Sequence, residues 1–311
     1  MSAHIPQIPE LDTLRAGGKR AMAMALAAVE TARGKPSLVA LLDRAAREPK
    51  ALVLGLTGPP GVGKSTLTNA LVRRARAAGR TVAVLAVDPS SRRTGGALLG
   101  DRARIQTDPE DRGVFVRSMA ARDRLGGLSD DAVAAVVLMR AVFDLVIVET
   151  VGVGQSEADI GLVADSVVLC IQPASGDSLQ FMKAGVMELP DIIVVTKADM
   201  ADIARRAAAD VSGALSLGGL PTQWTVPVIR LSAASGEGLE AFDAALAAHQ
   251  AHLALDGRLA AQRAEQEQRW VEEAIRLRFG TEGLALSRKM AVAASGPFSR
   301  EAAFAARLTR S

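Results

Sequence analysis

A short glycine-rich segment near residue 60 constrains the fold of this chain more than any other feature. Residues 58–65 read Gly-Pro-Pro-Gly-Val-Gly-Lys-Ser and fit the pattern G-x-x-x-x-G-K-[ST] of a phosphate-binding P-loop. Glycines at these positions let the backbone curl so that successive N–H groups point at a polyphosphate. In such a loop Lys64 reaches the β- and γ-phosphates, and the Ser65 hydroxyl binds Mg²⁺. The sequence therefore predicts a site for a nucleoside triphosphate with Mg²⁺, contacted by Gly58, Gly61, Val62, Gly63, Lys64, Ser65 and Thr66.

The segments around the loop predict the fold class. The apolar run 51–56 predicts a strand that enters the loop, and 66–78 predicts a helix whose N-terminus favours an anion. Beyond it, continuous apolar strands alternate with helical segments, which argues for a mostly parallel sheet covered on both faces. We therefore expect the α/β fold of a P-loop NTPase. Further strands are expected over 81–87, 145–149, 166–171, 192–196 and 226–231, and a helix over 130–141.

Helical segments are expected at both ends of this core. Apolar residues at helical spacing predict helices over 10–33 and 36–48, with Gly34-Lys35-Pro36 as the break. From Leu239 onward the chain is expected to be helical, including helices over 258–279 and 300–308. We therefore divide the chain into an N-terminal helical extension (1–50), a P-loop domain (51–248) and a C-terminal helical arm with a tail (249–311).

Composition narrows the classes of protein further. The 37 basic and 34 acidic residues give a formal charge of +3, which is too balanced to predict binding to nucleic acid or a membrane surface. The single cysteine, Cys170, fits a reducing compartment. The N-terminus lacks the apolar core of a signal peptide, so we expect a cytoplasmic protein. The most apolar stretch, 132–148, contains Arg140 and Asp144 and predicts a helix followed by a strand rather than a membrane span.

Two later segments indicate which base the nucleotide carries. Thr196-Lys197-Ala198-Asp199 ends an expected strand with Thr-Lys-x-Asp, where GTP-binding proteins usually have Asn-Lys-x-Asp. The Asp199 carboxylate can accept the N1–H and N2–H of guanine, whereas adenine offers no such pair. The aliphatic part of Lys197 can lie over the base. The loop that follows the last expected strand contains Ser232, Ala233 and Ala234, whose backbone N–H groups are suited to close over guanine. The sequence therefore predicts GTP or GDP as the bound nucleotide.

Carboxylates at other strand ends are candidates for the Mg²⁺ site. Glu149 ends the expected strand 145–149, and Gly152 behind it offers an N–H to the γ-phosphate. Asp88 and Asp101 lie on or beside a Gly/Ser-rich segment that suits a metal-sensing switch. Taken alone, these two aspartates are as well explained as loop caps.

These motifs, in this order, resemble those of the MeaB/MMAA/ArgK GTPases of the SIMIBI branch of P-loop proteins. The resemblance runs from about residue 10 to about residue 290 and includes Val-Asp-Pro-Ser-Ser (87–91), Thr-Gly-Gly-Ala-Leu-Leu-Gly-Asp-Arg (94–102) and Glu-Thr-Val-Gly-Val-Gly-Gln-Ser-Glu (149–157). Members of this family are GTPase chaperones of adenosylcobalamin-dependent acyl-CoA mutases, commonly methylmalonyl-CoA mutase. The resemblance implies that the chain hydrolyses GTP to gate the loading, protection and reactivation of such a mutase.

The family pattern also implies roles for individual residues. It gives Lys64 to the phosphates and Ser65, Asp88, Asp101 and Glu149 to Mg²⁺ and its switches. Residues 176–183 match the family's third switch, which relays the nucleotide state to the mutase through Asp177, Gln180 and Lys183. The C-terminal helices resemble the arm through which family members form homodimers.

The chain departs from the family pattern in its loops. Thr196 replaces the more frequent Asn, which weakens the inference of guanine selectivity. Arg122-Asp123-Arg124 replaces the usual Arg-Gly-His, and Arg92-Arg93 replaces the usual Pro-Phe. The changes at 122–124 and 92–93 fall in switch loops, where they could tune the choice of partner, and they leave the nucleotide chemistry unaltered.

The catalytic set is less complete than the binding set. It is expected to comprise Lys64, Asp88 and Asp101, with Gln155 placed to position water. An arginine finger would come from Arg102, Arg117, Arg122 or the partner. We therefore expect slow hydrolysis that the mutase accelerates.

Three other functions compete with this one. A metallochaperone would need clusters of Cys and His, and the chain has one Cys and three His, with a solvated His249–His252 pair as the better interpretation. A kinase that phosphorylates a transport protein would transfer phosphate to protein. A nucleotide-regulated scaffold would bind GTP with negligible turnover.

Overall fold

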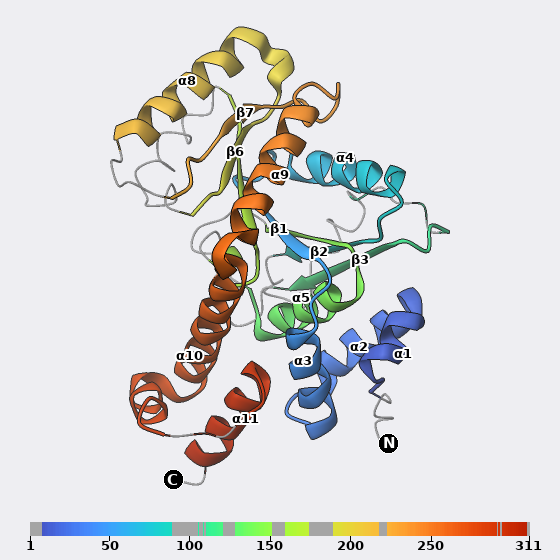
Figure 1. The fold of residues 1–311 in the computed structure, drawn as a ribbon, viewed down its shortest axis with the longest axis vertical. Coiled ribbons are helices and arrows are strands. Elements are labelled where there is room, and N and C mark those ends of the chain that lie inside the picture. Colours follow the sequence, from blue (N-terminus) through green and yellow to red (C-terminus); the bar gives the residue numbers. More distant parts are fainter. Residues whose placement is uncertain are drawn as a thin grey trace, which may run out of the picture.

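Seven parallel strands form the central sheet in the part of the chain that the structure describes (Figure 1). The computed structural model describes residues 8–88, 105, 108, 110–120, 128–150, 159–173, 189–217, 223–290, 292 and 294–309, with only the backbone described at Asp88. The strand order is β3-β2-β4-β1-β5-β6-β7, and all six pairings are parallel. The strands are β1 Leu52–Thr57, β2 Val82–Asp88, β3 Val114–Ala120, β4 Leu145–Thr150, β5 Ser166–Ile171, β6 Ile192–Val195 and β7 Val228–Arg230.

Helices cover both faces of this sheet. One face packs against α2 and α5, through strand residues such as Leu85 and Val148. On the opposite face α4 and α9 pack against residues such as Leu56 and Ile147. A third cluster joins α8 to β5 and β6. The helices are α1 Leu11–Ala16, α2 Gly18–Thr31, α3 Pro36–Arg47, α4 Lys64–Ala77, α5 Asp130–Val142, α8 Ala201–Leu217, α9 Leu239–Ala254, α10 Arg258–Ser287 and α11 Pro297–Leu308.

The α/β class and the parallel sheet predicted from the sequence are confirmed. The first predicted helix, 10–33, is wrong in one respect, because it divides at Gly17 into α1 and α2. Strand β3 was not predicted at all. Arg117 and Ser118 interrupt the apolar run of this strand. The interruption is tolerated because β3 is an edge strand, which pairs with only one neighbouring strand.

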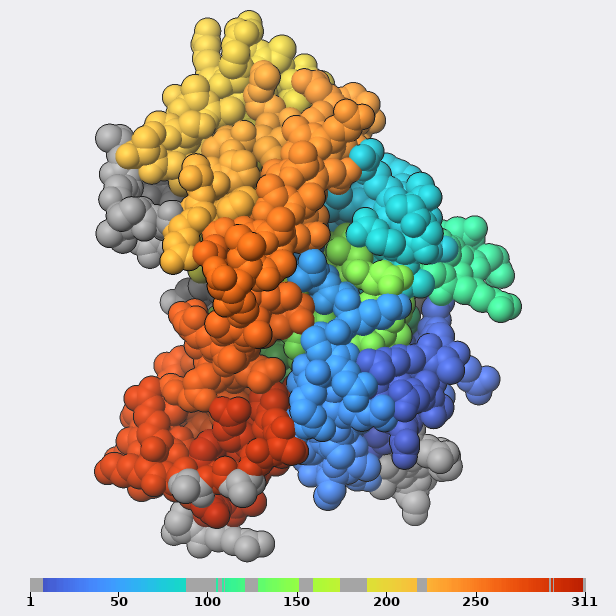
Figure 2. Space-filling model, viewed as in Figure 1, coloured from blue at the N-terminus to red at the C-terminus, as the bar shows by residue number. Residues whose placement is uncertain are grey.

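The helices of both chain ends pack against each other in the lower half of Figure 1. In the space-filling view, α11 (red) adjoins α3 (blue) (Figure 2). The buried Asp43 carboxylate of α3 accepts hydrogen bonds from the backbone N–H groups of Phe298 (2.9 Å) and Ser299 (3.2 Å), in the first turn of α11. The N-cap of α11 is Gly296, which has no side chain to serve this purpose. Asp43 therefore supplies from another helix the anion that a helix N-terminus favours.

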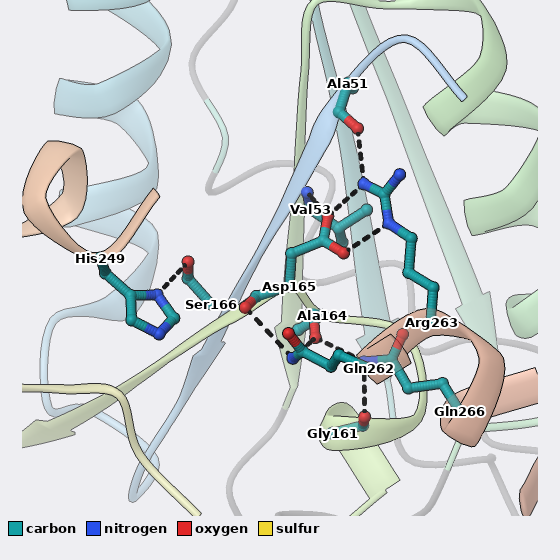
Figure 3. A network of polar contacts seen from close by, with 10 residues as sticks. All are labelled: Ala51, Val53, Gly161, Ala164, Asp165, Ser166, His249, Gln262, Arg263 and Gln266. Atoms are coloured by element: carbon teal, nitrogen blue, oxygen red, sulfur yellow. Dashed lines mark hydrogen bonds and ion pairs between the residues drawn. The ribbon is translucent and has the colours of Figure 1, made fainter. Parts of the chain in front are cut away.

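A buried ion pair attaches α10 to the amino-terminal edge of the sheet (Figure 3). Asp165, which is 0% exposed, receives two hydrogen bonds from Arg263, at 2.8 and 2.7 Å, and one from the Val53 backbone N–H at 2.7 Å. Arg263 also donates to the Ala51 carbonyl (3.0 Å). Burial, reinforced by the charge of Arg263, lowers the pKa of nearby Arg140 to about 10. The start of β1, the start of β5 and α10 thus share one polar junction.

His249 corrects an expectation drawn from the sequence. It was expected in a solvated pair with His252, but only 2% of its surface is exposed. Its Nδ1 lies 2.8 Å from Ser166 Oγ, and its Nε2 lies 3.2 Å from the Asp191 carboxylate. Trp224 packs against both histidines, with ring centroids 4.8 and 5.2 Å apart. The pattern of the sequence could not show this, because Ser166 begins β5 and Asp191 immediately precedes β6, both far from His249 in the chain.

Within the described residues, no helix has the length and apolar character needed to span a bilayer.

The helices before β1 share a core cluster with the sheet and with α10. The division at residues 51 and 249 stays a prediction.

We expect Asp165→Ala to lower the free energy of unfolding by about 3–5 kcal/mol, because it leaves the Arg263 guanidinium buried and uncompensated. Urea titration followed by far-UV circular dichroism measures this change. Glu265→Ala is the control, since its pair with Arg269 on the same helix is exposed and is expected to contribute less than about 1 kcal/mol. Equal effects of the two substitutions would contradict the role given to Asp165.

Candidate functional site

The glycine-rich loop leaves the carboxyl end of β1, where β4 and β5 are its neighbours in the sheet. Gly58, Gly61 and Gly63 have φ angles of 131°, 74° and 110°, which L side chains rarely adopt. A Cβ atom at Gly58 would lie 2.1 Å from the backbone oxygen of Cys170 in β5. The first glycine is therefore required by close contact with β5 as well as by its backbone conformation. Gly63 ends the loop and forms the N-cap of α4.

Lys64 is the first residue of α4, and only 6% of its surface is exposed. Its Nζ donates hydrogen bonds to the carbonyl oxygens of Gly58 (2.6 Å) and Pro59 (2.9 Å). The ammonium group is thus folded across the loop that precedes it. This placement sets a positive charge beside backbone curled by glycines at the start of a helix, an arrangement suited to a polyphosphate.

A carboxylate from β4 meets α4 directly beneath the loop. Glu149 pairs in register with Leu56 of β1 and is 8% exposed. Its Oε1 accepts a hydrogen bond from Ser65 Oγ (2.7 Å), and its Oε2 accepts one from Thr68 Oγ1 (3.0 Å). Both carboxylate oxygens are therefore oriented by hydroxyl groups of one helix.

This oxygen set fits the Mg²⁺ ion that the P-loop pattern implies. A hydroxyl has one donor hydrogen and two lone pairs, so Ser65 can donate to Glu149 and still present a lone pair to a cation. Magnesium prefers oxygen ligands, usually one or two from protein with the remainder from phosphate and water. Ser65 and Glu149 are the described residues that would hold such an ion.

The two base-recognition segments lie next to each other at the same edge of the sheet. Thr196 is buried, and its Oγ1 donates to the Ile171 carbonyl (3.0 Å) at the end of β5. The Ala198 N–H donates to the Leu231 carbonyl (3.3 Å), which joins the Thr-Lys-x-Asp segment to the Ser232–Ala234 loop. Lys197 has a left-handed conformation (φ 55°), and Asp199 is exposed. The Asp199 carboxylate, on the first of these two joined loops, is therefore accessible to a guanine base.

Thr196 explains how the chain accommodates the missing Asn. Its methyl carbon lies 4.0 Å from where a Cβ of Gly63 would be, so it packs beside the P-loop. Its hydroxyl bonds to β5 rather than to the loop. The segment is therefore held to β5 by a short side chain.

Several predicted site residues fall outside the described part of the chain. These are Asp101, Gly152, Gln155, Asp177, Gln180, Lys183 and the side chain of Asp88. Among the arginine-finger candidates, Arg102 and Arg122 also lie outside it. Arg117 is described and does not face the loop. It pairs in register with Leu85, on the face that packs against α2, and forms an ion pair with Glu30 of α2 at 2.8 Å.

The cysteine beside the loop has no nucleophilic role. Cys170 is fully buried, and burial raises the pKa of its thiol to about 12. The thiol is therefore protonated at neutral pH and acts as a small apolar side chain.

Comparison with known proteins identifies the family. The model of the family described as "Methylmalonyl Co-A mutase-associated GTPase MeaB" matches residues 21–282. The chain belongs to this family. A protein of Pyrococcus horikoshii named as a GTPase is 41% identical over 262 residues, covering 81% of this chain and 80% of that protein. The mouse mitochondrial methylmalonic aciduria type A homolog is 39% identical over 228 residues, covering 72% of this chain and 55% of that protein.

Solved structures agree with this assignment. The structure described as an LAO/AO transport system kinase has a TM-score of 0.69 and 29% identity, covering 90% of this chain and 88% of that one. The hydrogenase maturation factor HypB of Archaeoglobus fulgidus has a TM-score of 0.50 at 17% identity, covering 67% of this chain and 94% of that one, a likeness of fold alone. The predicted family and P-loop fold are thus confirmed, and the family supports guanine-nucleotide binding and GTP hydrolysis.

We expect Gly58→Ala to abolish binding of a fluorescent GTP analogue, because the new Cβ collides with the Cys170 carbonyl. Gly61→Ala is the matched control. It also places alanine at positive φ, yet its Cβ would meet nothing within 4 Å, so only backbone strain of about 1–2 kcal/mol applies. Fluorescence titration and thermal melting report binding and folding separately. Binding by the Gly58 variant at wild-type strength would contradict the required contact with β5.

Asp199→Ala is expected to weaken GDP binding about 10-fold to 100-fold while leaving any ADP binding unchanged. Each hydrogen bond from guanine to a carboxylate contributes roughly 1.5–3 kcal/mol. Competition titrations against a fluorescent GDP analogue measure both affinities. Asp202→Ala, which removes another exposed carboxylate on the next turn, is the control and is expected to change neither. If both variants bound GDP equally well, another group would have to recognise the base.

Proposed function

We propose that this protein hydrolyses GTP with Mg²⁺ and uses the cycle to control cofactor loading of an acyl-CoA mutase. The mutase would depend on adenosylcobalamin, with methylmalonyl-CoA mutase as the first candidate. The observation that carries the proposal is the family match over residues 21–282, because the family is described by its association with that mutase. The mouse relative, whose name refers to methylmalonic aciduria, also supports methylmalonyl-CoA mutase as the candidate partner.

The chemistry would rest on electrostatic stabilisation by groups around the P-loop. Bound Mg²⁺ would neutralise charge that develops on the phosphates. Lys64 would leave the carbonyls of Gly58 and Pro59 and bind phosphate oxygens, while the loop N–H groups hold the rest of the chain of phosphates. Ser65 and Glu149 would hold the ion, and Asp88 and Asp101 would sense it from the switch segments. Gln155 would position the attacking water.

We propose that hydrolysis by the protein alone is slow and that the mutase accelerates it, as the sequence pattern predicts. Among the arginine-finger candidates, Arg117 is the described one, and it forms an ion pair with Glu30 of α2. In this proposal the mutase completes the site or orders it. Asp177, Gln180 and Lys183 would transmit the nucleotide state to the mutase. Residues 249–311 would form the homodimer contact.

A protein kinase is the second candidate, because the solved structure at a TM-score of 0.69 is described as a transport system kinase. Such an activity would leave the γ-phosphate on a protein side chain rather than on water. A metallochaperone has less support. Within the described residues, no group of three or more His, Cys, Asp or Glu is placed to hold a metal ion.

The test is turnover of GTP and ATP by the purified protein, alone and with an adenosylcobalamin-dependent acyl-CoA mutase from the same organism. We expect GTP-selective release of phosphate that rises when the mutase is added. Lys64→Ala is the control and should remove the activity, because it deletes the charge at the phosphates.

The same assay separates the alternatives. Label from γ-labelled GTP that stays on protein would indicate a kinase. Equal rates with ATP, or a GTP rate indifferent to every mutase, would contradict the chaperone function.

A further inference from the structure

Thr68 is a fully buried polar residue in the second turn of α4, and it belongs to none of the sequence motifs described above. Its relative exposure is 0%, and its Oγ1 donates a 3.0 Å hydrogen bond to Oε2 of Glu149. It follows Ser65 by three residues, so the two hydroxyls lie on one face of the helix. That face is directed at the carboxyl end of β4.

The two hydroxyls have different environments. Ser65 is partly exposed, and its lone pairs remain open to a cation at the surface of the site. Thr68 lies deeper, where Leu67 and Ala70 on either side of it belong to the core beneath α4. Thr68 donates to Oε2 of the Glu149 carboxylate from the buried side of the site, and Ser65 donates to Oε1 from the more exposed side.

Glu149 needs this second contact because of its length. A glutamate side chain has one more rotatable bond than an aspartate side chain. Fixing a long side chain costs up to about 1.5–2 kcal/mol of rotamer entropy. The hydrogen bonds from Ser65 and Thr68, one to each oxygen, define the plane of the carboxylate.

We propose that Thr68 is a positioning residue for the Mg²⁺ site, which holds Glu149 in the orientation that serves the ion. This inference rests on the proposed function, since it assumes that Ser65 and Glu149 hold Mg²⁺ beside a guanine nucleotide. Residues that orient metal ligands in this way typically affect metal affinity by about 10-fold to 100-fold when they are removed. Because Thr68 is fully buried and bonds to Glu149, it would act on the ion through that carboxylate.

A purely structural role predicts a different result. Loss of the buried hydroxyl also removes its hydrogen bond to Glu149, which lowers stability. That effect would weaken nucleotide binding equally with and without Mg²⁺. Only a positioning role changes the response to Mg²⁺ while binding in its absence is preserved.

The test is the Mg²⁺ dependence of fluorescent GDP binding by Thr68→Val, which keeps the shape of the side chain and removes the hydroxyl. GDP affinity is measured in EDTA and across a MgCl₂ titration. We expect the Mg²⁺ concentration at half-effect to rise about 10-fold, with the affinity in EDTA within about 2-fold of the original. Thr68→Ser retains the hydroxyl and should restore the original midpoint.

Thr81→Val is the matched control. Thr81 Oγ1 also donates to a carboxylate, Asp144 Oδ2, at 2.7 Å, but it precedes β2 at the opposite edge of the sheet. We expect this variant to leave the Mg²⁺ midpoint unchanged. If circular dichroism shows that Thr68→Val does not fold, Thr68→Ala removes the same hydroxyl and is held to the same criterion.

The outcomes separate this inference from the proposed function. An unchanged Mg²⁺ midpoint in the Thr68 variants, or an equal loss of affinity with and without Mg²⁺, would overturn the positioning role alone. If the unaltered protein bound GDP without any response to Mg²⁺, the Mg²⁺ site of the proposed function would be wrong, and the role of Thr68 would fall with it.

Discussion

The parallel pairing of every strand in the sheet is the constraint on which the site depends. Because β1 and β4 run in the same direction, the P-loop after β1 and Glu149 at the end of β4 emerge at one edge. The same pairing brings the Thr196 segment and the Ser232 loop to that edge from β6 and β7. Ligands of open α/β sheets bind at such carboxyl ends. An antiparallel arrangement of the same strands would have placed these groups at opposite edges.

The amino-terminal ends of the strands, opposite the nucleotide site, anchor the helices of the chain ends. Asp165 and Arg263 join α10 to the starts of β1 and β5, and Asp43 caps α11 from α3. Trp270 of α10 packs against Phe298 of α11, with ring centroids 4.5 Å apart and the rings tilted by 47°. Because these contacts lie at the amino ends of the strands and the nucleotide site lies at their carboxyl ends, the terminal helices pack against the sheet without covering that site.

Close approach and buried hydrogen bonds set the geometry of the P-loop more narrowly than its sequence pattern does. Gly58 lies against the Cys170 carbonyl of β5, and the Glu149 carboxylate is held by two hydroxyls of α4. The loop is thus placed by a strand on one side and by a helix on the other. Such contacts keep phosphate-binding groups in position before a ligand arrives, which reduces the cost of binding.

Much of this protein was determined by the local sequence. The P-loop pattern and the apolar runs predicted the parallel α/β fold and the nucleotide-binding loop, because a glycine-rich turn between strand and helix has few other solutions. The order of motifs predicted the family. Local pattern failed at β3, where Arg117 and Ser118 interrupt the apolar run of the strand, and at His249, which was expected in solvent.

The tertiary structure alone decided which distant polar groups meet. Thr68 and Glu149 are 81 residues apart, and Asp165 and Arg263 are 98 residues apart. No spacing in the chain predicts such pairs, because they arise from the order of strands in the sheet and from the faces that α4 and α10 present to it. Burial then makes these contacts obligatory, since a polar group removed from water must find its partner inside the protein.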